Sequence, residues 1–341
     1  MPSKKFCDLF GGPSREPESE LLQMHKDIAA ALQERVEEIQ LMQLRHLHEE
    51  TESKNLVMGG GVALNSVFNG KILRDTPFEH VWIHPNATDG GSSVGAAFYV
   101  YNTIFDNERS CEFTDPYQGP SYSDREIKDF LEEHGVVYEQ FEDNASLTKN
   151  VAEILYDNKV VAWFQGAMEW GPRALGARSI LSNASNPDMK EILNTKVKHR
   201  EPFRPFAPVV CAEDAPTYFD CDIPVPTPAD YMLMVYPIKS EYHDKIPAVT
   251  HVDGSGRLQT VREEQNKLYY DLIQEFGKLS GTPILVNTSF NIRGEPIVCS
   301  PFDAYRCMMG TGIDCLVMGS FLIWREKNPQ HMWDSEALAI D

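Results

Sequence analysis

The sequence is short of positive charge. Its 341 residues include 31 lysines and arginines against 51 aspartates and glutamates, which gives a formal net charge of −20. Duplex nucleic acid and anionic membranes attract proteins through basic surfaces, so this balance disfavours both as partners. It is compatible with a small anion held by a local group of arginines.

Paired cysteines and long apolar runs are also absent. The seven cysteines are scattered and include no C-x-x-C pair, which favours reduced thiols over a disulfide framework or a zinc site. No run reaches the about 18 apolar residues of a membrane-spanning helix. The first residues, MPSKKFCDLFGG, contain no apolar core of a signal peptide. These absences predict a cytoplasmic protein without a membrane span.

Two strand–glycine–helix units point to an α/β architecture. The apolar strand 55–58 runs into three glycines, and the strand 80–83 leads through Asp89-Gly90-Gly91 to an alanine-rich helix. Repeated units of this kind are typical of nucleotide-binding α/β folds.

The domain boundary is predicted in the polar stretch 107–123, which Pro116 and Pro120 interrupt. One domain then covers 1–106 and the other 124–341. Apolar periodicity and composition predict the remaining elements. The expected helices are 19–50, 94–101, 124–133 and 303–309, and the expected later strands are 160–164, 283–286, 315–318 and 321–324.

The glycine turns have two interpretations each. Gly60 and Gly61 would let backbone amides approach a phosphate, but a tight structural turn explains them equally well. Asp89 can ligate a metal, although its spacing favours the N-cap of the next helix. His80 and His84 lie about 13 Å apart if their segment is a strand, too far to share a metal. We expect both to be ordinary surface or edge residues.

Basic residues concentrate between Arg173 and Arg204. The stretches GPRALG and FRPF set these two arginines between glycines and prolines, where a long helix cannot run. Arginine forks match phosphate and carboxylate oxygens, and lysine adds a mobile charge. We therefore predict a phosphate-type anion site, with a solvated helix face as the alternative for Lys190 and Lys196.

Two further segments, 250–257 and 287–291, are expected to be loops rich in small hydrogen-bond donors. NTSFN follows an apolar strand and suits a phosphate nest, although an Asn/Ser-rich turn explains it equally well. No Ser-His-Asp, Cys-His or P-loop signature occurs. The chemistry indicated is phosphate or acyl-phosphate activation rather than covalent hydrolysis.

Taken together, these motifs resemble the NodU/CmcH family of O-carbamoyltransferases. The resembling stretches run from near the first residue to beyond Arg306, and GPRALGARSIL, REPFRPFAP and NTSFNIRGEPIV are the most specific. The resemblance implies an α/β fold with two parts. The C-terminal part of an actin/Hsp70-like (Kae1-like) domain would be followed by a YrdC-like α/β domain.

The resemblance also implies an ATP-dependent reaction, with Mg bound to the ATP. The YrdC-like domain would form carbamoyladenylate and pyrophosphate from carbamoyl phosphate and ATP. The Kae1-like domain would pass the carbamoyl group to a hydroxyl beside a metal, typically iron.

The family motifs place roles on particular residues. By resemblance, the catalytic residues are Arg173, Lys198, Arg257 and Ser289. Candidates for binding substrate and phosphate in the same motifs are Arg178, Arg200, Arg204, Asn287, Asn291 and Arg293. Gly60, Gly61 and Asn65 would contact the nucleotide of the Kae1-like site, and Asp89 would be a metal ligand.

The sequence departs from the family near its beginning. Family members carry a His-x-x-x-His metal motif on a helix of the Kae1-like domain, and no such helical motif occurs here. We expect the chain to lack the N-terminal half of that domain. Fe(II) or another divalent metal would then bind only when the missing half-site is supplied, through self-association or a partner.

The acceptor is expected to be a small-molecule hydroxyl. One alternative is a hydroxymethylated nucleobase in nucleic acid. Another is a non-catalytic or half-reaction subunit that pairs with a histidine-bearing Kae1-like protein.

Overall fold

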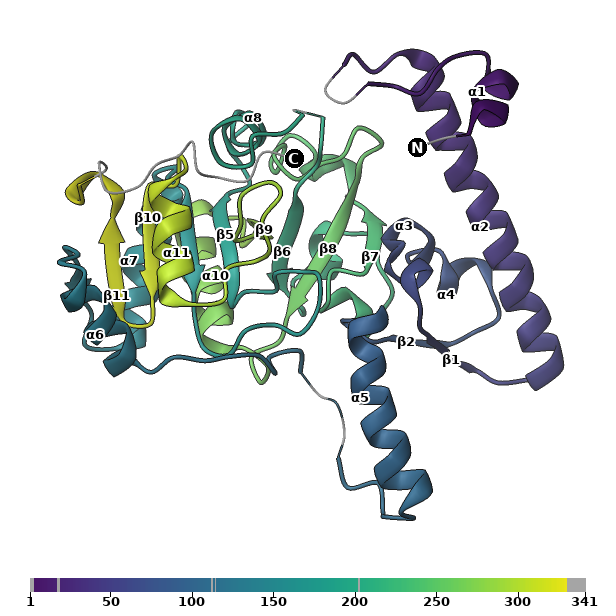
Figure 1. The fold of residues 1–341 in the computed structure, drawn as a ribbon, viewed down its shortest axis with the longest axis horizontal. Coiled ribbons are helices and arrows are strands. Elements are labelled where there is room, and N and C mark those ends of the chain that lie inside the picture. The colour runs from purple at the N-terminus through teal and green to yellow at the C-terminus, as the bar shows by residue number, and fades with distance from the viewer. Residues whose placement is uncertain (1–2, 17–18, 112, 114, 202, 330–341) are drawn as a thin grey trace.

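The computed structural model describes residues 3–16, 19–111, 113, 115–201 and 203–329, which form helices packed on two sheets (Figure 1). The helices are α1 (Lys4–Phe10), α2 (Gln23–Thr51), α3 (Ser66–Asn69), α4 (Ile72–Asp75), α5 (Asp89–Tyr99), α6 (Asp124–Glu133), α7 (Asn144–Tyr156), α8 (Met189–Ile192), α9 (Ala215–Tyr218), α10 (Lys267–Ser280) and α11 (Pro301–Met309). The strands are β1 (Asn55–Met58), β2 (His80–Ile83), β3 (Glu139–Gln140), β4 (Val161–Phe164), β5 (Arg178–Asn183), β6 (Ala207–Cys211), β7 (Met234–Pro237), β8 (Ser255–Val261), β9 (Leu285–Ser289), β10 (Cys315–Met318) and β11 (Phe321–Trp324).

The larger sheet is mixed and has nine strands within the described residues, in the order β3-β11-β10-β4-β5-β9-β6-β8-β7. β4 pairs with β10 and β6 with β8 in parallel, whereas the other neighbours are antiparallel. The pairing of β5 with β9 sets Ser179 opposite Ser289. This register brings two of the predicted anion-site segments side by side.

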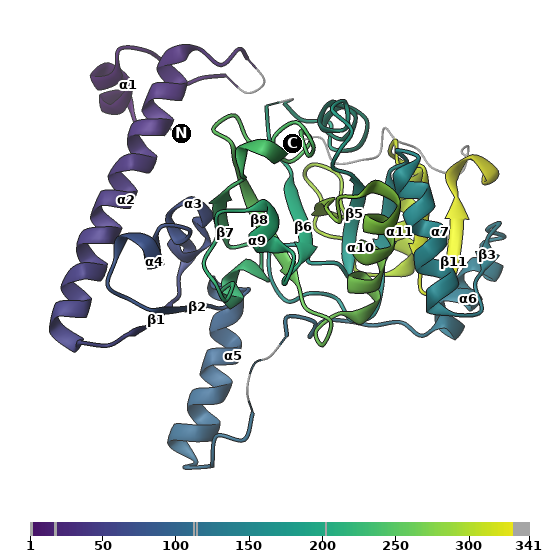
Figure 2. The same cartoon turned by 180° about the vertical axis from the view of Figure 1, so that it is seen from behind.

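Two hydrophobic cores cover the faces of this sheet. α7 and α10 pack on Val161 and Trp163, whereas α6 and α11 pack on Ala162 and Phe164. Figure 1 shows α11 in front of the sheet, and Figure 2 shows α7 and α10 in front of the opposite face. Side chains alternate between the faces of a strand, so β4 is buried at every residue. This double burial explains its uninterrupted apolar sequence.

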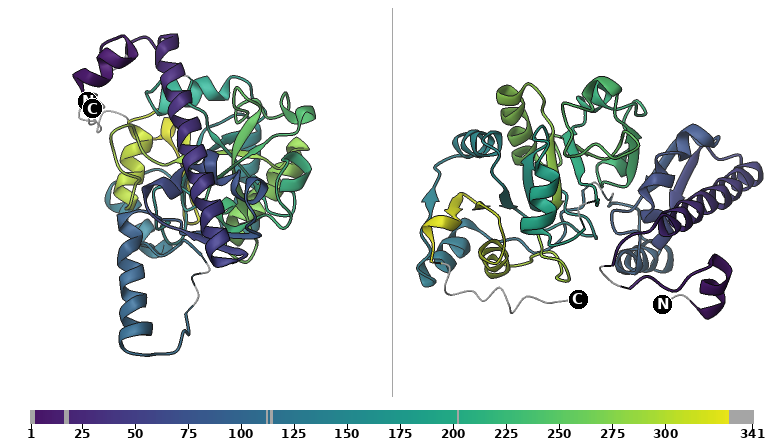
Figure 3. Two further views of the ribbon diagram at one scale, coloured as in Figure 1. Left: turned by 90° about the vertical axis from the view of Figure 1, so that its right-hand side faces the viewer. Right: turned by 90° about the horizontal axis from the view of Figure 1, so that it is seen from above.

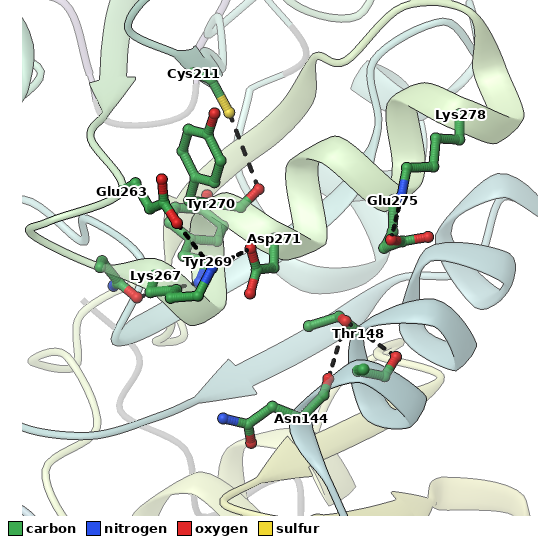
Figure 4. A network of polar contacts seen from close by, with 12 residues as sticks. Asn144, Thr148, Cys211, Glu263, Lys267, Tyr269, Tyr270, Asp271, Glu275 and Lys278 are labelled. Atoms are coloured by element: carbon green, nitrogen blue, oxygen red, sulfur yellow. Dashed lines mark hydrogen bonds and ion pairs between the residues drawn. The ribbon is translucent and has the colours of Figure 1, made fainter.

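The outer side of α10 is polar and solvent-exposed. Lys267 Nζ lies 2.9 Å from a Glu263 oxygen and 3.0 Å from an Asp271 oxygen, as Figure 4 shows. Exposed ion pairs of this kind contribute only about 0–1 kcal/mol each. Tyr269, on the inner side, is fully buried against the sheet, so packing rather than charge fixes the helix.

The N-terminal part of the chain packs against β7, the last strand of the large sheet. β1 and β2 form a separate parallel pair. The buried Asn69 side chain donates to the carbonyl of Leu233 at 2.9 Å, and a Cβ added to Gly70 would lie 2.0 Å from the Val235 carbonyl oxygen. One hydrophobic cluster continues from this part into the large sheet. Figure 3 shows α2 along its outer side.

The predicted linker is partly ordered against the rest of the chain. Backbone hydrogen bonds join Met168 to Pro120 and Gly119 at 2.9 and 2.8 Å, and Trp170 to Pro116 at 2.6 Å. Residues 116–120 therefore run beside residues 168–170. The division of the chain at 107–123 stays a prediction.

Two helices expose apolar surface. Leu44 is the buried residue among those described in α2, whose Leu32 and Met42 are each 64% exposed. α5 has no buried residue and extends away from the rest of the molecule in Figure 1. Just beyond it, Ile104 and Phe105 are also exposed. Among the described residues, no helix combines the length and apolarity needed to cross a membrane.

The α/β class predicted from the sequence is confirmed, as are the strands at 55–58 and 80–83 and the helix at 124–133. The predicted loops are partly wrong. Arg257 lies within β8, and the 287–289 part of NTSFN continues β9. Both segments are strands because neighbouring buried strands hydrogen-bond to their backbones.

Candidate anion-binding site

The loop 169–178 carries Arg173 and bends through two glycines of positive φ, +146° at Gly171 and +111° at Gly176. A Cβ at Gly176 would lie 2.2 Å from the Tyr269 ring, and one at Gly171 would lie 2.7 Å from the Pro85 carbonyl oxygen. Other residues rarely adopt such φ values. The glycines therefore allow the loop to pack between α10 and the turn that precedes α5.

Arg178 closes this loop from within the core. It is fully buried, and its guanidinium donates to the carbonyls of Gln165, Ala177, Pro120 and Gly166 at 2.9–3.2 Å. The guanidinium also stacks 3.6 Å from the centre of the Phe164 ring. Burial lowers the pKa of Arg178 to about 10. These contacts fit a residue that holds the loop, and its role in binding substrate stays a prediction.

Arg173, Arg257 and Arg200 bring positive charge together beside the loop. Burial lowers the pKa of Arg173, whose Nε has no hydrogen-bond partner among the described residues. Burial and the charges of Arg173 and Arg200 lower the pKa of Arg257 to about 9. The described residues supply no carboxylate in an ion pair with Arg173 or Arg257. Like charges held together away from water are stabilised by a bound anion.

Lys198 lies at the end of β9 and is only 4% exposed. Its Nζ donates to Oδ1 and the carbonyl of Asn291 at 2.9 and 3.1 Å, and it also contacts the Oγ and carbonyl of Ser289. Burial, together with the nearby charge of Arg200, lowers the pKa of Lys198 to about 7. The structure thus brings together three of the residues predicted to act on phosphate.

Asn287 and Arg200 support this cluster through other hydrogen bonds. The Asn287 side chain donates to the carbonyl of Ala174 at 3.0 Å, which ties β9 to the loop. Arg200 Nε donates to Asn194 Oδ1 at 2.8 Å, and its guanidinium faces Phe206 at 4.9 Å. Their roles in binding substrate stay predictions.

Arg204 and Arg293 lie at the margin. Arg204 is exposed, and its Nε lies 2.9 Å from a carboxylate oxygen of Glu201. Arg293 is half-buried in the segment after β9. Arg204 therefore lies at the surface with Glu201 as its ion-pair partner, and its charge helps to lower the pKa of Arg200.

The predicted nucleotide contacts of the N-terminal part form a second, more open place. Gly60 has a φ of +93°, and its amide donates to the carbonyl of Ala87 at 2.6 Å, whereas Gly61 is exposed. Asn65 is the N-cap of α3, where it accepts from the amide of Phe68 at 3.2 Å. The structural-turn interpretation accounts for these contacts, and nucleotide binding stays a prediction.

Asp89 is exposed and is the first residue of α5. Thr88 holds the N-cap position, so the alternative assignment of Asp89 to the cap is wrong by one residue. His84 is half-buried directly after the edge strand β2, and its Nδ1 accepts from the amide of Asn86 at 2.9 Å. Within the described residues, no three His, Cys, Asp or Glu side chains gather as metal ligands. The side chains described around Asp89 do not fit a complete transition-metal site.

Sequence reasoning missed Glu169 and Gln259. Gln259 donates from β8 to the carbonyl of Leu175 at 2.8 Å, and the Glu169 carboxylate is buried beneath the loop. Only the position of Glu169 directly before WGPRALG pointed to it in the sequence. Gln259 lies in a strand without a distinctive motif.

The fold and the cationic cluster define an α/β protein with a candidate anion site, and the chain belongs to the carbamoyltransferase family. The family models described as Carbamoyltransferase C-terminus and Carbamoyltransferase N-terminus match residues 152–325 and 1–98. An uncharacterized protein of Synechocystis sp. is 43% identical over 98% of this chain and 58% of its own length. Nodulation protein NolNO of Sinorhizobium fredii is 41% identical over 93% of this chain and 47% of its own length.

The chain spans about half the length of these curated relatives. The matches do not support the expectation that the chain lacks the first half of its N-terminal domain, which stays a prediction. The family identified from the motifs is confirmed.

Two solved structures match part of the chain at low similarity. Full-length HypF in the phosphate- and nucleotide-bound form is 19% identical, with a TM-score of 0.39, and the match covers 52% of this chain and 25% of that chain. Sua5 of P. abyssi complexed with L-threonine is 16% identical, with a TM-score of 0.39, over 53% of this chain and 48% of that chain.

Proposed function

We propose that this chain carries out the activation step of an ATP-dependent O-carbamoyltransferase. Carbamoyl phosphate and ATP would give carbamoyladenylate and pyrophosphate, with one water consumed and one inorganic phosphate released to balance the atoms. The observation that carries the proposal is the group formed by buried Lys198 and half-buried Arg173 and Arg257 in a chain whose net charge is −20. Its residues lie in stretches that resemble the family, and Arg173 lies in the specific motif GPRALGARSIL.

The chemistry asked of these residues is electrostatic. Both substrates carry phosphate groups, and negative charge shifts between phosphate oxygens as pyrophosphate leaves. Donors already fixed in a site removed from water stabilise such charge without reorganising. Arg173 and Arg257 would hold phosphate oxygens through their guanidinium groups, and Lys198 would hold one beside Ser289. Mg is expected to accompany the ATP.

The transfer step would place the carbamoyl group on a hydroxyl of a small molecule or a modified nucleoside. We derive no metal-dependent step, because the described residues around Asp89 do not form a complete ligand set. A second candidate function, a half-reaction subunit with a partner, is favoured by the apolar surface that α2 and α5 expose.

Release of pyrophosphate from ATP, measured with and without carbamoyl phosphate, tests the proposal on the purified chain. Arg173→Ala and Lys198→Ala should each lose about 2–4 kcal/mol of transition-state stabilisation, the scale for one electrostatic donor. Asp89→Ala should release pyrophosphate normally.

Lys196→Ala and Arg125→Ala are matched controls that remove exposed basic side chains. Full activity of Arg173→Ala would contradict its assignment. Pyrophosphate release that is independent of carbamoyl phosphate would contradict the reaction.

A further inference from the structure

Glu169 lies at the base of the loop that carries Arg173, and its side chain makes an unusual set of contacts. The residue is 5% exposed. One carboxylate oxygen, Oε1, accepts from the backbone amides of Leu175, Ala177 and Arg178 at 2.7, 2.6 and 3.2 Å. The other oxygen is buried without a hydrogen-bond partner among the described residues. A single oxygen thus gathers three amides from the far end of the loop.

These contacts determine which groups of the loop can face a ligand. The amide of Gly176, between the three bound amides, donates to Ser179 Oγ at 3.0 Å. The carbonyl of Leu175 accepts from Gln259 and Tyr117 at 2.8 and 3.0 Å. The backbone amides of residues 175–178 are all engaged inside the protein and cannot form a phosphate nest. The side chain of Arg173, whose Nε has no hydrogen-bond partner among the described residues, is therefore a donor that this loop can offer to an anion.

Burying the Glu169 carboxylate has a free-energy cost that a turn without a buried acidic side chain would avoid. Burial of a charged group is unfavourable unless hydrogen bonds compensate it. Glutamine could accept the same amides through a neutral oxygen, but hydrogen bonds to an ionised acceptor are roughly twice as strong. The carboxylate thus holds the loop more strongly than a neutral side chain would, although it costs more free energy to bury.

We propose that Glu169 is a positioning residue for the anion site, which fixes the loop 169–178 so that Arg173 meets the phosphate of carbamoyl phosphate. This role rests on the proposed function. Glu169 acts through the backbone of the loop and does not itself contact the substrate. Its loss should therefore weaken the use of carbamoyl phosphate only as far as Arg173 is displaced.

Steady-state kinetics of pyrophosphate release test this role. Glu169→Ala should lower kcat/KM for carbamoyl phosphate about 100-fold, the effect expected of a displacement of about 1 Å at a reacting centre. Glu169→Gln, which keeps an acceptor oxygen, should recover activity to within about 5-fold of wild type, because neutral acceptors form weaker bonds. If Glu169→Ala does not fold, Glu169→Asp shortens the side chain by one methylene and serves in its place.

Asp314→Ala is the matched control for lost stability. Asp314 accepts from the amide of Val160 at 2.7 Å, just before β4 and at the end of that strand away from Phe164 and Arg178. Asp314→Ala should lower the melting temperature and leave kcat/KM for carbamoyl phosphate within about 2-fold of wild type, because the residue lies away from the site. Wild-type kcat/KM in Glu169→Ala would overturn the proposal.

A double-mutant cycle separates positioning from a general loss of structure. In the Arg173→Ala background, Glu169→Ala should cost less than about 2-fold further, because two residues that act through one contact are not additive. Additive losses would overturn the proposal.

Amide hydrogen exchange at Leu175 and Ala177 distinguishes the two failures. Absence of pyrophosphate release by the wild-type chain would overturn the proposed function and the role toward Arg173. Faster exchange in Glu169→Ala would still show that Glu169 holds the amides of the loop. Unchanged exchange would exclude that role.

Discussion

The loop at 169–178 and the turn at 59–65 both bend through glycines of positive φ, but their surroundings differ. A Cβ at Gly176 would collide with the Tyr269 ring, whereas one at Gly60 would meet nothing within 4 Å. The loop packs against the large sheet and carries buried Arg178 and half-buried Arg173, whereas most of the turn is exposed to solvent. The comparison teaches that the chain holds the first region rigid by itself and leaves the second open.

Substitution of the two glycines tests this difference most strongly. Gly176→Ala should lower the free energy of unfolding by about 3 kcal/mol, from backbone strain of about 1–2 kcal/mol and overpacking of about 1–3 kcal/mol. Gly60→Ala should lower it by about 1–2 kcal/mol, because strain alone applies. Urea denaturation measures both values. Equal losses would show that the two turns are equally constrained.

The pH dependence of activation sharpens the comparison next. Burial holds the pKa of Lys198 at about 7. As pH rises through this value, Lys198 loses its charge, so kcat/KM for carbamoyl phosphate should fall up to tenfold per pH unit. Lys198→Met should abolish this step in the profile. The same step retained in Lys198→Met would assign it to another group.

The stability effect of Lys198 has the opposite sign. Its pKa in the folded protein is below the ordinary value of 10.5. The unfolded chain therefore binds more protons between about pH 7 and 10.5, and the contribution of Lys198 to stability rises with pH in that window.

The exposed apolar residues just beyond α5 give the smallest expected effect on stability. Ile104→Glu and Phe105→Glu should change the free energy of unfolding by less than about 0.5 kcal/mol, since both side chains are exposed. They should reduce self-association in sedimentation experiments, because charge is unfavourable in an apolar contact. Pyrophosphate release should be unchanged.

A wild-type chain that sediments as a monomer and binds no apolar dye would contradict the predicted assembly. It would show that the apolar surface of α2 and α5 needs no partner to cover it.

Parts of the fold followed from local pattern. Strands such as 161–164 and 315–318 are apolar at every residue because both faces of the sheet are covered. The helix at 124–133 was predictable because Ser123 and Glu126 form a capping box at its start. Strand β8 was missed because Arg257 and its neighbouring glycines resemble a loop until β6 and β7 supply hydrogen bonds on both sides.

The candidate site was predicted as a set of residues rather than as an arrangement. Arg173 and Lys198 were expected to share one site, because both lie in stretches that resemble the family, and this sharing stays a prediction. Arg178 lies in the same motif, yet its guanidinium is engaged by backbone carbonyls. Sequence could not separate the two arginines, because which of them turns inward depends on the partners around it.

The sequence by itself determined the α/β class, the concentration of positive charge in an acidic chain and the family. These properties depend on composition and on residues close together in the sequence, so they do not require knowledge of which distant segments meet. Only the tertiary structure decided that Arg173 and Arg257 lack carboxylate partners among the described residues, that Asn291 and Ser289 hold Lys198, and that Glu169 anchors the loop. These arrangements depend on burial and on hydrogen bonds between distant segments, because both determine the free energy of placing a charged side chain at each position.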